Sequence, residues 1–158
     1  MNTSVIFENS GCAELDVLPE CYYEKATAED ISVLPCTDAE TEHDYISQIK
    51  DALNGKSQEV WTLKENGKSV CFLILTDAVS IRFDRKCKYV SAIYTLSEYR
   101  NKGYAQSLLK SVIKKNGNDK FLYVADSDKN IASLKLARKC GFDIIGYNHQ
   151  IKTDRRKI

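Results

Sequence analysis

The sequence predicts a single α/β domain, and three observations lead to that fold class. The chain has 158 residues, which suits one domain with a sizeable core. Short runs of strand-forming residues alternate with segments whose apolar residues recur at helical spacing. Residues 89–117 are expected to form a strand, a glycine turn and a helix in direct succession, and the rest of the chain is read around them.

Residues 1–20 are expected to form an N-terminal extension outside the main domain. Residues 4–7, Ser-Val-Ile-Phe, have the composition of a strand, and residues 9–11, Asn-Ser-Gly, have that of a turn. Residues 15–18 are a candidate for a second strand. The extension is therefore interpreted as an added hairpin or a mobile arm.

The next segment is expected to contain a strand and two helices. Residues 21–26 suit a strand, and Thr27 then caps a short helix that ends before Pro35. A second helix is expected to open at Thr37 or Asp38 and to run to about Leu53. The apolar face of this second helix consists of Tyr45, Ile46, Ile49 and Leu53.

Strands joined by turns follow the second helix. Residues 58–64 and 69–76 flank Asn66-Gly67, a dipeptide that is typical of tight hairpin turns. A further strand is expected at 79–83 and another at 87–95, with a turn at 84–86 between them.

The second half is expected to alternate helices and strands. Apolar residues at helical spacing predict a helix from about 104 to 115, and residues 121–125 suit a short buried strand. Residues 126–128, Asp-Ser-Asp, are expected to cap a helix over 129–139.

The chain is expected to close with one more strand and a tail. Gly141 suits the end of the preceding helix, and residues 144–151 suit the strand. The main domain therefore spans residues 21–151. Residues 152–158 are basic and are expected to be an exposed tail.

The turn before the central helix has the features of an anion-binding site. The first amides of a helix lack internal partners and point outward along the positive end of its dipole. Gly103 and Ala105 would let a ligand approach this backbone, and Arg100 and Lys102 add positive charge. The spacing alone is equally compatible with an ordinary strand-to-helix connection. The turn consists of Arg100, Asn101, Lys102, Gly103, Tyr104 and Ala105.

The pattern Arg-x-x-Gly-x-Ala after an apolar strand resembles the pyrophosphate loop of the GNAT superfamily of acetyl-CoA-dependent N-acetyltransferases. A second block supports the resemblance. Residues 130–133, Asn-Ile-Ala-Ser, followed by Leu136 and then Gly141-Phe142, are similar to the family's second cofactor helix and its terminal Gly-Phe. The clear resemblance covers residues 87–147, and a fainter one covers residues 22–75.

The resemblance implies a central mixed sheet of about six or seven strands with helices on both faces. It also implies acetyl-CoA as the co-substrate and a primary amine as the acceptor. Backbone amides of Ile93, Tyr94 and Thr95 would polarise the thioester carbonyl, in a gap where this strand splays from its neighbour. Asn130 would hold the pantetheine amide, and the turn 100–105 would bind the pyrophosphate.

The sequence departs from the family where the reaction needs a proton donor. The usual family tyrosine, four residues before Gly-Phe, is replaced here by Ala137, and the strand 87–95 has no Asp or Glu to act as a base. Ser133 shares a helix face with Ala137 and is the candidate donor. Glu98, beside the turn, is a candidate base. The alternatives are that Ser133 only packs against the cofactor arm and that Glu98 is solvated surface.

The predicted function is transfer of an acetyl group from acetyl-CoA to a primary amine of a small molecule or a protein. The missing tyrosine keeps a different class open, a catalytically silent acyl-CoA-binding or regulatory module. Acetylation of a macromolecular amine is a third reading. The expected assembly is a monomer or a homodimer.

Charge is divided unevenly along the chain. Residues 1–99 hold 9 Lys and Arg against 17 Asp and Glu, whereas residues 100–140 hold 10 against 3. The basic segment suits a ligand with several phosphate charges. The acidic segment would suit a cationic acceptor, or equally a solvated surface. No interleaving of aromatic and basic residues indicates nucleic acid as a partner.

Cysteine usage and hydropathy indicate a cytoplasmic protein. The six cysteines include no C-x-x-C pair and the two histidines lie far apart, so no zinc pattern exists. Cys71, Cys87 and Cys140 lie in apolar contexts and are expected to be reduced core residues. No apolar run is long enough to span a bilayer, and the N-terminal residues lack a signal-peptide pattern. We therefore expect no metal and no membrane partner.

Overall fold

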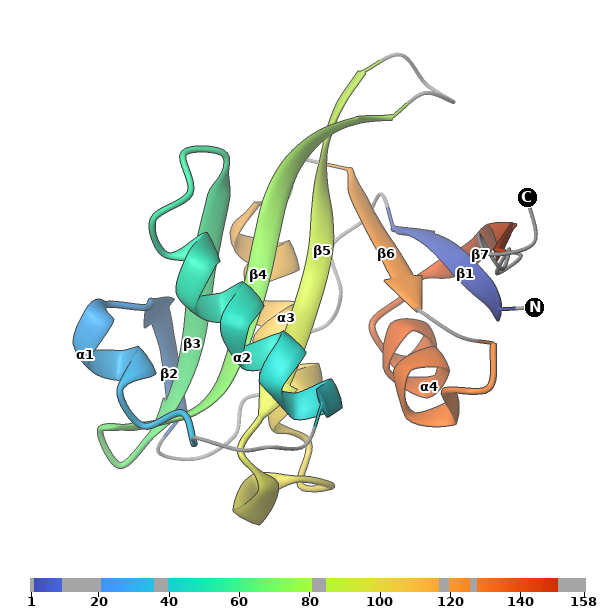
Figure 1. Ribbon diagram of the computed structural model, residues 1–158. Helices are drawn as coiled ribbons and strands as arrows, with labels where there is room; N and C mark the ends of the chain where they lie inside the picture. The colour runs from blue at the N-terminus through green and yellow to red at the C-terminus, as the bar shows by residue number, and fades with distance from the viewer. Residues whose placement is uncertain are drawn as a thin grey trace, which may run out of the picture.

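The fold was obtained as a computed structural model that describes residues 2–9, 21–35, 40–80, 85–116, 120–125 and 128–150. Seven strands form one mixed sheet in the order β2-β3-β4-β5-β6-β1-β7 (Figure 1). This confirms the predicted α/β fold with a central mixed sheet. The strands are β1 (Asn2–Asn9), β2 (Cys21–Lys25), β3 (Gln58–Glu65), β4 (Lys68–Ser80), β5 (Arg85–Thr95), β6 (Phe121–Ala125) and β7 (Asp143–Gln150).

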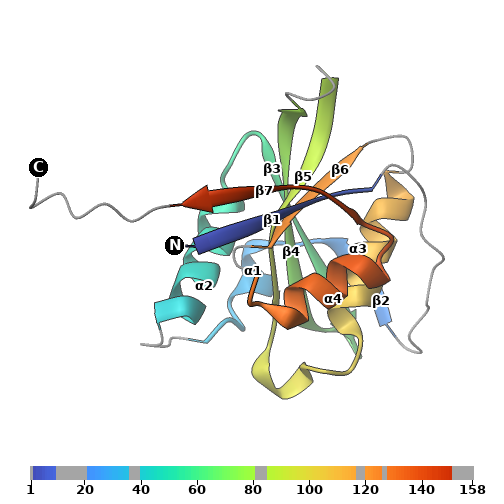
Figure 2. The same ribbon diagram turned by 90° about the vertical axis from the view of Figure 1, so that its right-hand side faces the viewer.

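Helices cover both faces of the sheet, as expected. The pair α1 and α2 lies on one side, and the pair α3 and α4 lies on the other (Figure 2). A short 3₁₀ helix, η1, separates β5 from the turn that leads into α3. The helices are α1 (Ala28–Ile31), α2 (Glu40–Ala52), η1 (Ser97–Tyr99), α3 (Tyr104–Lys115) and α4 (Ile131–Lys139).

Alternation along the strands builds a separate apolar core on each face. Phe72 and Ile74 of β4 pack in the cluster that contains the buried side of α2, whereas Leu73 and Leu75 pack in the cluster that contains α3. The period of two in the strand therefore sends successive side chains to opposite helix layers. Central strands of this kind are apolar on both faces, which is why β4 has a nearly continuous apolar sequence.

The N-terminal strand β1 lies inside the sheet. It pairs antiparallel with β6 on one side and with β7 on the other, so that Val5 stands opposite both Ala125 and Tyr147. Phe7 is fully buried. The strand predicted at residues 4–7 is confirmed, but the interpretation as an added hairpin or mobile arm is wrong for β1, because both of its edges are hydrogen-bonded to the domain. Residues 10–20, with the rest of the predicted turn and the second strand, lie outside the described residues.

The strands β5 and β6 are paired for only part of their length. Their parallel register joins Lys88 to Phe121 and ends where Val90 meets Tyr123. Beyond that point β5 continues to Thr95 and is paired with β4 alone among the described strands. A register shift between Ile74 and Leu75 of β4 marks a bulge at the same level of β5. The two parallel strands therefore part at their carboxyl ends, as the resemblance implied.

Two local predictions differ from the structure. Residues 79 and 80 continue β4, so the separate strand predicted at 79–83 does not begin there; β5 opens at residue 85, and residues 81–84 lie outside the described part. The cap of α4 is Asn130, whose side chain accepts a hydrogen bond from the amide of Ser133. The predicted cap at 126–128 is therefore wrong for Asp128, since the helix starts later, and residues 126 and 127 are not described.

Other predicted boundaries fall partly outside the described residues. The predicted start of α2 at residue 37 or 38 lies in the stretch 36–39, which is not described. The predicted tail 152–158 is not described either. Of the helices that the structure describes, none is both long enough and apolar enough to cross a membrane.

Candidate active site

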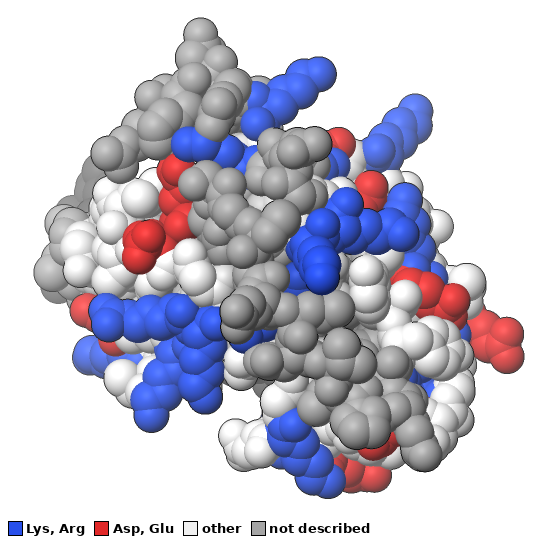
Figure 3. All heavy atoms as spheres, turned by 180° about the vertical axis from the view of Figure 1, so that it is seen from behind, with Lys and Arg blue, Asp and Glu red and all other residues white. Residues whose placement is uncertain are grey.

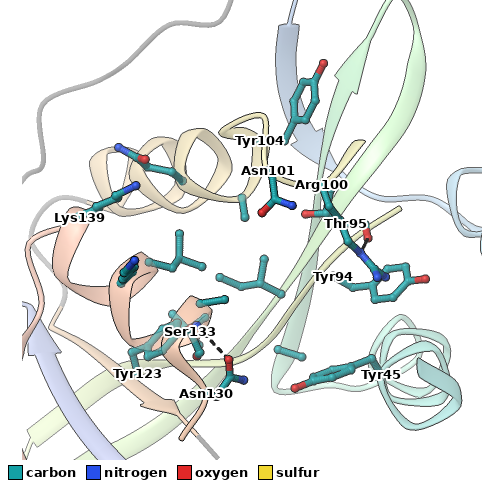
Figure 4. Close-up of a pocket in the computed structure, with 18 of the residues that line it drawn as sticks. Tyr45, Tyr94, Thr95, Arg100, Asn101, Tyr104, Tyr123, Asn130, Ser133 and Lys139 are labelled. Carbon is teal, nitrogen blue, oxygen red and sulfur yellow. Dashed lines mark hydrogen bonds between the residues drawn. The ribbon is translucent and has the colours of Figure 1, made fainter. Parts of the chain in front are cut away.

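A cavity of about 790 Å³ opens where β5 and β6 part (Figure 4). Its walls come from β5, the turn after η1, the start of α3, β6 and α4, and Tyr45 reaches it from α2. Most of the predicted site residues meet here, although they come from distant parts of the chain. The lining includes Ile93, Tyr94, Thr95, Arg100, Asn101, Gly103, Tyr104, Ala105, Asn130 and Ser133. Lys102 and Glu98 do not line it; their predicted roles stay predictions.

One end of the cavity has the geometry of an anion site. Asn101 and Gly103 both adopt left-handed backbone conformations, with φ of 62° and 86°. Alternation of this kind turns successive amides toward one side. The helix α3 begins at Tyr104 and has no acidic residue in its first turn, so nothing there offsets the positive end of its dipole. The turn thus presents backbone donors and a helix terminus to the same space.

The cations of the turn pack against aromatic rings. The Arg100 Nε atom donates to the Thr95 carbonyl at 3.0 Å, and the guanidinium carbon lies 5.5 Å from the centre of the Tyr94 ring. The Lys102 Nζ atom lies 5.7 Å from the centre of the Tyr99 ring. Arg100 therefore ties the turn to the end of β5 in addition to bringing charge to the cavity.

Two further cations, Lys135 and Lys139, line the cavity from α4. The sequence reasoning missed them, although a signal was present. Ile131, Lys135 and Lys139 follow one another at intervals of four residues, so all three share one helix face. Ile131 belongs to the block 130–133 that resembles the family's second cofactor helix. The helical spacing could therefore have predicted that both lysines lie on the same side of this helix as Ile131.

The open edge of β5 forms the floor of the cavity. Ile93, Tyr94 and Thr95 line it, and in this stretch β5 pairs with β4 on its other side. Among the described strands, β4 alone pairs with β5 in this stretch, and a strand edge that faces no second strand can bind an extended ligand by strand addition. The backbone of this stretch can therefore bind an amide-containing arm.

On α4, Asn130 and Ser133 are held by one another and by β6. The Asn130 Oδ1 atom accepts from the Ser133 amide at 3.2 Å, which caps the helix. This bond uses the oxygen, so the Nδ2 group remains the part of Asn130 that can meet a ligand carbonyl. The Ser133 hydroxyl lies 2.6 Å from the hydroxyl of Tyr123.

Tyr123 is a site residue that sequence reasoning did not find. It was interpreted only as part of a buried strand, and its partner Ser133 was assigned from the family pattern. The tyrosine lines the cavity although its side chain is only 6% exposed. A general signal existed, because a buried tyrosine hydroxyl usually finds a hydrogen-bond partner, but the sequence could not say which one.

Ala137 does not reach the cavity. It is fully buried in the core between the sheet and the helices α3 and α4, and it is absent from the cavity lining. The small residue is therefore part of the packing of this core. A tyrosine at this position would need room that the packed core does not offer.

Several described acids of the first half form ion pairs with residues that do not line the cavity. Glu24 and Asp30 pair with Lys64, and Glu59 pairs with Lys25. No Asp or Glu is among the described residues that line the cavity. The face turned away from the viewer in Figure 1 carries several groups of Lys and Arg side chains (Figure 3). The lining thus gives no support to the expected preference for a cationic acceptor.

Cys71, Cys87 and Cys140 are free and buried, which confirms their assignment to the core. Burial raises the pKa of the Cys71 thiol to about 12, and hydrogen bonds from Thr95 and from the backbone of Phe72 offset this only in part. In the part of the chain that the structure describes, no three His, Cys, Asp or Glu side chains are grouped to hold a metal ion.

Comparisons with known proteins place this fold among acetyltransferases. A sequence model described as the acetyltransferase (GNAT) family matches residues 14–142. A solved protein from Novosphingobium aromaticivorans, described as an acetyltransferase of the GNAT family, has a TM-score of 0.62 at 12% identity, over 92% of this chain and 61% of that one. This chain therefore spans less than two thirds of the length of that protein.

Two other solved structures match over nearly their whole length. A ribosomal-protein-alanine N-acetyltransferase from Brucella melitensis biovar Abortus has a TM-score of 0.63 at 15% identity, over 84% of this chain and 99% of that one. A protein from Clostridium acetobutylicum, described as an acetyltransferase with acetyl-CoA, has a TM-score of 0.55 at 15% identity, over 87% and 98%. At these identities the structures show the fold alone. Among curated proteins, none matches this chain.

Proposed function

Because this chain belongs to the GNAT acetyltransferase family, we propose that it transfers the acetyl group of acetyl-CoA to the nitrogen of a primary amine. The observation that carries the proposal is the cavity between β5 and β6, which joins the anion site at α3 to the open edge of β5. Acetyl-CoA combines a pyrophosphate with an amide-containing arm, and both kinds of group find donors in this one space. The volume of about 790 Å³ is within the usual range for ligand sites.

The residues present fit acetyl-CoA as follows. The turn at Asn101 and Gly103 would hold the pyrophosphate with backbone amides, supported by Arg100. The Nδ2 group of Asn130 and the edge of β5 would hold the pantetheine arm. When bound, acetyl-CoA supplies an acyl group activated as a thioester. The chain itself orients that group and offers backbone donors from β5 to the oxygen that gains negative charge during attack.

The acceptor amine must reach the thioester without its extra proton. Since no carboxylate is among the described lining residues, we propose that water in the open cavity takes up this proton. Glu98, the other candidate base, is exposed on η1 and does not line the cavity. Its role as a base could be exerted only through water.

The second candidate function is a catalytically silent acyl-CoA-binding module. The observation that favours it is Ala137, which leaves α4 without the family's tyrosine. The acceptor itself stays a proposal, either a small-molecule amine or an amine on a protein. The same holds for assembly as a monomer or a homodimer.

An acetyl-transfer assay separates the two candidates. The protein is incubated with acetyl-CoA and a panel of amines, and both free thiol and acetylated amine are measured. Amine-dependent release of thiol with matching acetylated product supports transfer. A protein whose melting temperature rises with acetyl-CoA, but which acetylates no amine or lysine-containing peptide in the panel, would favour the silent module.

A further inference from the structure

Ser133 alone would be a poor proton donor in place of the missing tyrosine. An alkyl hydroxyl that gives up its proton becomes an alkoxide, a very strong base that must be reprotonated at once. Phenols are much stronger acids than alkyl alcohols, and tyrosine is the one hydroxyl side chain with an accessible pKa. A phenol that is hydrogen-bonded to the Ser133 hydroxyl could therefore reprotonate it while the serine donates its own proton.

The structure contains such a phenol. The Tyr123 and Ser133 hydroxyl oxygens are 2.6 Å apart, a short hydrogen bond in which either atom can donate. Ser133 is half-buried on the first turn of α4, whereas Tyr123 is 6% exposed on β6. Both line the cavity. The serine is thus the more accessible member of the pair, and the tyrosine lies deeper.

Both side chains are held firmly in place. The Tyr123 ring packs edge-on against Phe7, with 5.9 Å between ring centres, and packs at a tilt against Phe142, with 5.6 Å between ring centres. On the other side, the Asn130 oxygen binds the Ser133 amide and fixes the first turn of α4. Packing and hydrogen bonds together set the distance between the two hydroxyls, which is what proton transfer requires.

The position of the pair in the fold adds to the argument. Tyr123 is the last residue of β6 that is in register with β5, so it stands at the point where the two strands part. The floor of the cavity, Ile93 to Thr95, begins just beyond this point on β5. Ser133 also lies one helical turn from Ala137, on the same face of α4.

We propose that Tyr123 is the proton source behind Ser133, so that two hydroxyls together do the work of the missing tyrosine; this rests on the proposed acetyl transfer. As the carbon–sulfur bond breaks, its electron pair stays on sulfur, and Ser133 gives its proton to that sulfur. Tyr123 gives its proton to the Ser133 oxygen. Water returns a proton to Tyr123, and the surplus proton of the amine nitrogen passes to water, so that protons balance. Ser133 is the catalytic residue, and Tyr123 is a positioning and relay residue.

The first test uses kinetics of conservative variants. Tyr123→Phe keeps the ring and its packing, so it should fold, and it should lower kcat by about a hundredfold while KM for acetyl-CoA changes little. Ser133→Ala should do the same, whereas Ser133→Thr keeps a hydroxyl and should retain most of the activity. The control is Tyr147→Phe, which removes an exposed hydroxyl from β7, outside the cavity lining, and should behave as the unaltered protein.

Two further features identify a relay. The double variant Tyr123→Phe with Ser133→Ala should be no slower than either single variant, because the two residues act as one unit. The fall of kcat at alkaline pH, where the donor loses its proton, should vanish in Tyr123→Phe. Unchanged kcat in Tyr123→Phe, or losses that multiply in the double variant, would overturn the relay.

A binding measurement keeps the relay separate from the proposed function. A donor facing the sulfur favours the thiolate of free coenzyme A, so binding of coenzyme A should release protons at neutral to alkaline pH. Calorimetry in two buffers of different ionisation enthalpy measures that release, which should shrink in Tyr123→Phe and in Ser133→Ala. Equal release in all three proteins would contradict the relay even without any known amine. If no amine is acetylated but the proton release still depends on Tyr123, the proposed acetyl transfer is rejected and the assignment of the hydroxyl pair stands.

Discussion

Gly103 and Gly67 have almost the same backbone but lie at different places. Their φ angles are 86° and 80°, and an added Cβ would meet nothing within 4 Å at either position. Gly103 borders the cavity at the start of α3, whereas Gly67 lies in the turn between β3 and β4. The two glycines therefore allow backbone strain to be separated from an effect on ligand binding.

Gly103→Val should abolish the rise in melting temperature that acetyl-CoA produces, because a side chain there closes the approach to the backbone of the turn. Gly67→Val should strain the chain by a similar amount, about 1–3 kcal/mol, and should keep the full ligand-dependent rise. Thermal melts with and without acetyl-CoA measure both variants. A rise retained in Gly103→Val, or lost in Gly67→Val, would refute the assignment of the turn.

Cys71 should be unreactive in the native protein. Its thiol has a pKa of about 12 because of burial, and only the thiolate attacks disulfide reagents. A raised pKa means that the thiol stays protonated at pH of about 8, where such reagents are used. A variant with serine at positions 12, 21 and 36 retains only the three buried cysteines and should react only after unfolding in urea. Rapid reaction before unfolding would show that this core opens.

At the scale of single residues, the sequence predicted what is local. The turn from Arg100 to Ala105 carries its signal in six adjacent residues, and all of them except Lys102 line the cavity. Tyr123 and Tyr45 come from other elements, and only the fold brings them to the same space. A hydroxyl pair such as Tyr123 with Ser133 is a tertiary contact, and no pattern within either segment encodes it.

At the scale of elements, α1 depends on a capping box and one ion pair. Thr27 and Asp30 exchange hydrogen bonds at the start of this helix, and the Lys64 ammonium lies 2.9 Å from the Asp30 carboxylate. Burial alone would raise the pKa of Asp30, but hydrogen bonds from Lys64 and Thr27 outweigh it and hold the pKa below its usual value. The ionised carboxylate therefore stabilises the folded state.

Asp30→Asn should lower the free energy of unfolding by about 1 kcal/mol at neutral pH. A carboxyl whose folded pKa is depressed contributes stability above its unfolded pKa and loses it as pH falls through the folded value. The difference between the two proteins should therefore shrink below pH of about 4. Urea unfolding at a series of pH values measures it. The exposed Asp51→Asn serves as control and should change stability by less than about 0.5 kcal/mol; a gap that is constant with pH would argue against the ion pair.

The spacing of apolar residues predicted whether each element is a helix or a strand. It did not predict the lengths of the strands or their neighbours in the sheet. The prediction divided the strand β4 into residues 69–76 and 79–83, with Asp77 between the two parts. In the structure Asp77 stands opposite Lys88 of β5 and pairs with it, so the strand continues as a two-stranded arm. The strand β1 was recognised as a strand, but its neighbours β6 and β7 lie more than a hundred residues away in the sequence. Pairing at such a separation leaves no local signal.

At the scale of the whole molecule, β1 joins β6 to β7, so its core residues should support the entire fold. Phe7→Ala should lower the free energy of unfolding by about 3–5 kcal/mol, because it leaves a cavity beside Tyr123 in the core. Phe7→Leu should cost less than about 1.5 kcal/mol. Urea unfolding measures both. An alanine variant no less stable than the leucine variant would mean that β1 unfolds independently of the rest.

The position of β1 also has a consequence during biosynthesis. The ribosome makes this strand before both strands that hydrogen-bond to it, and β7 is not complete until residue 150. At about 5–20 residues per second, the interval between the ends of β1 and β7 is roughly 7–28 seconds. Until β6 and β7 are made, Val5, Ile6 and Phe7 lack the strands to which they hydrogen-bond in the native sheet, and they are accessible to chaperones or to other nascent chains. This half of the sheet can close only after translation has passed its last strand, so slower elongation lengthens the exposure and gives no opportunity for earlier folding.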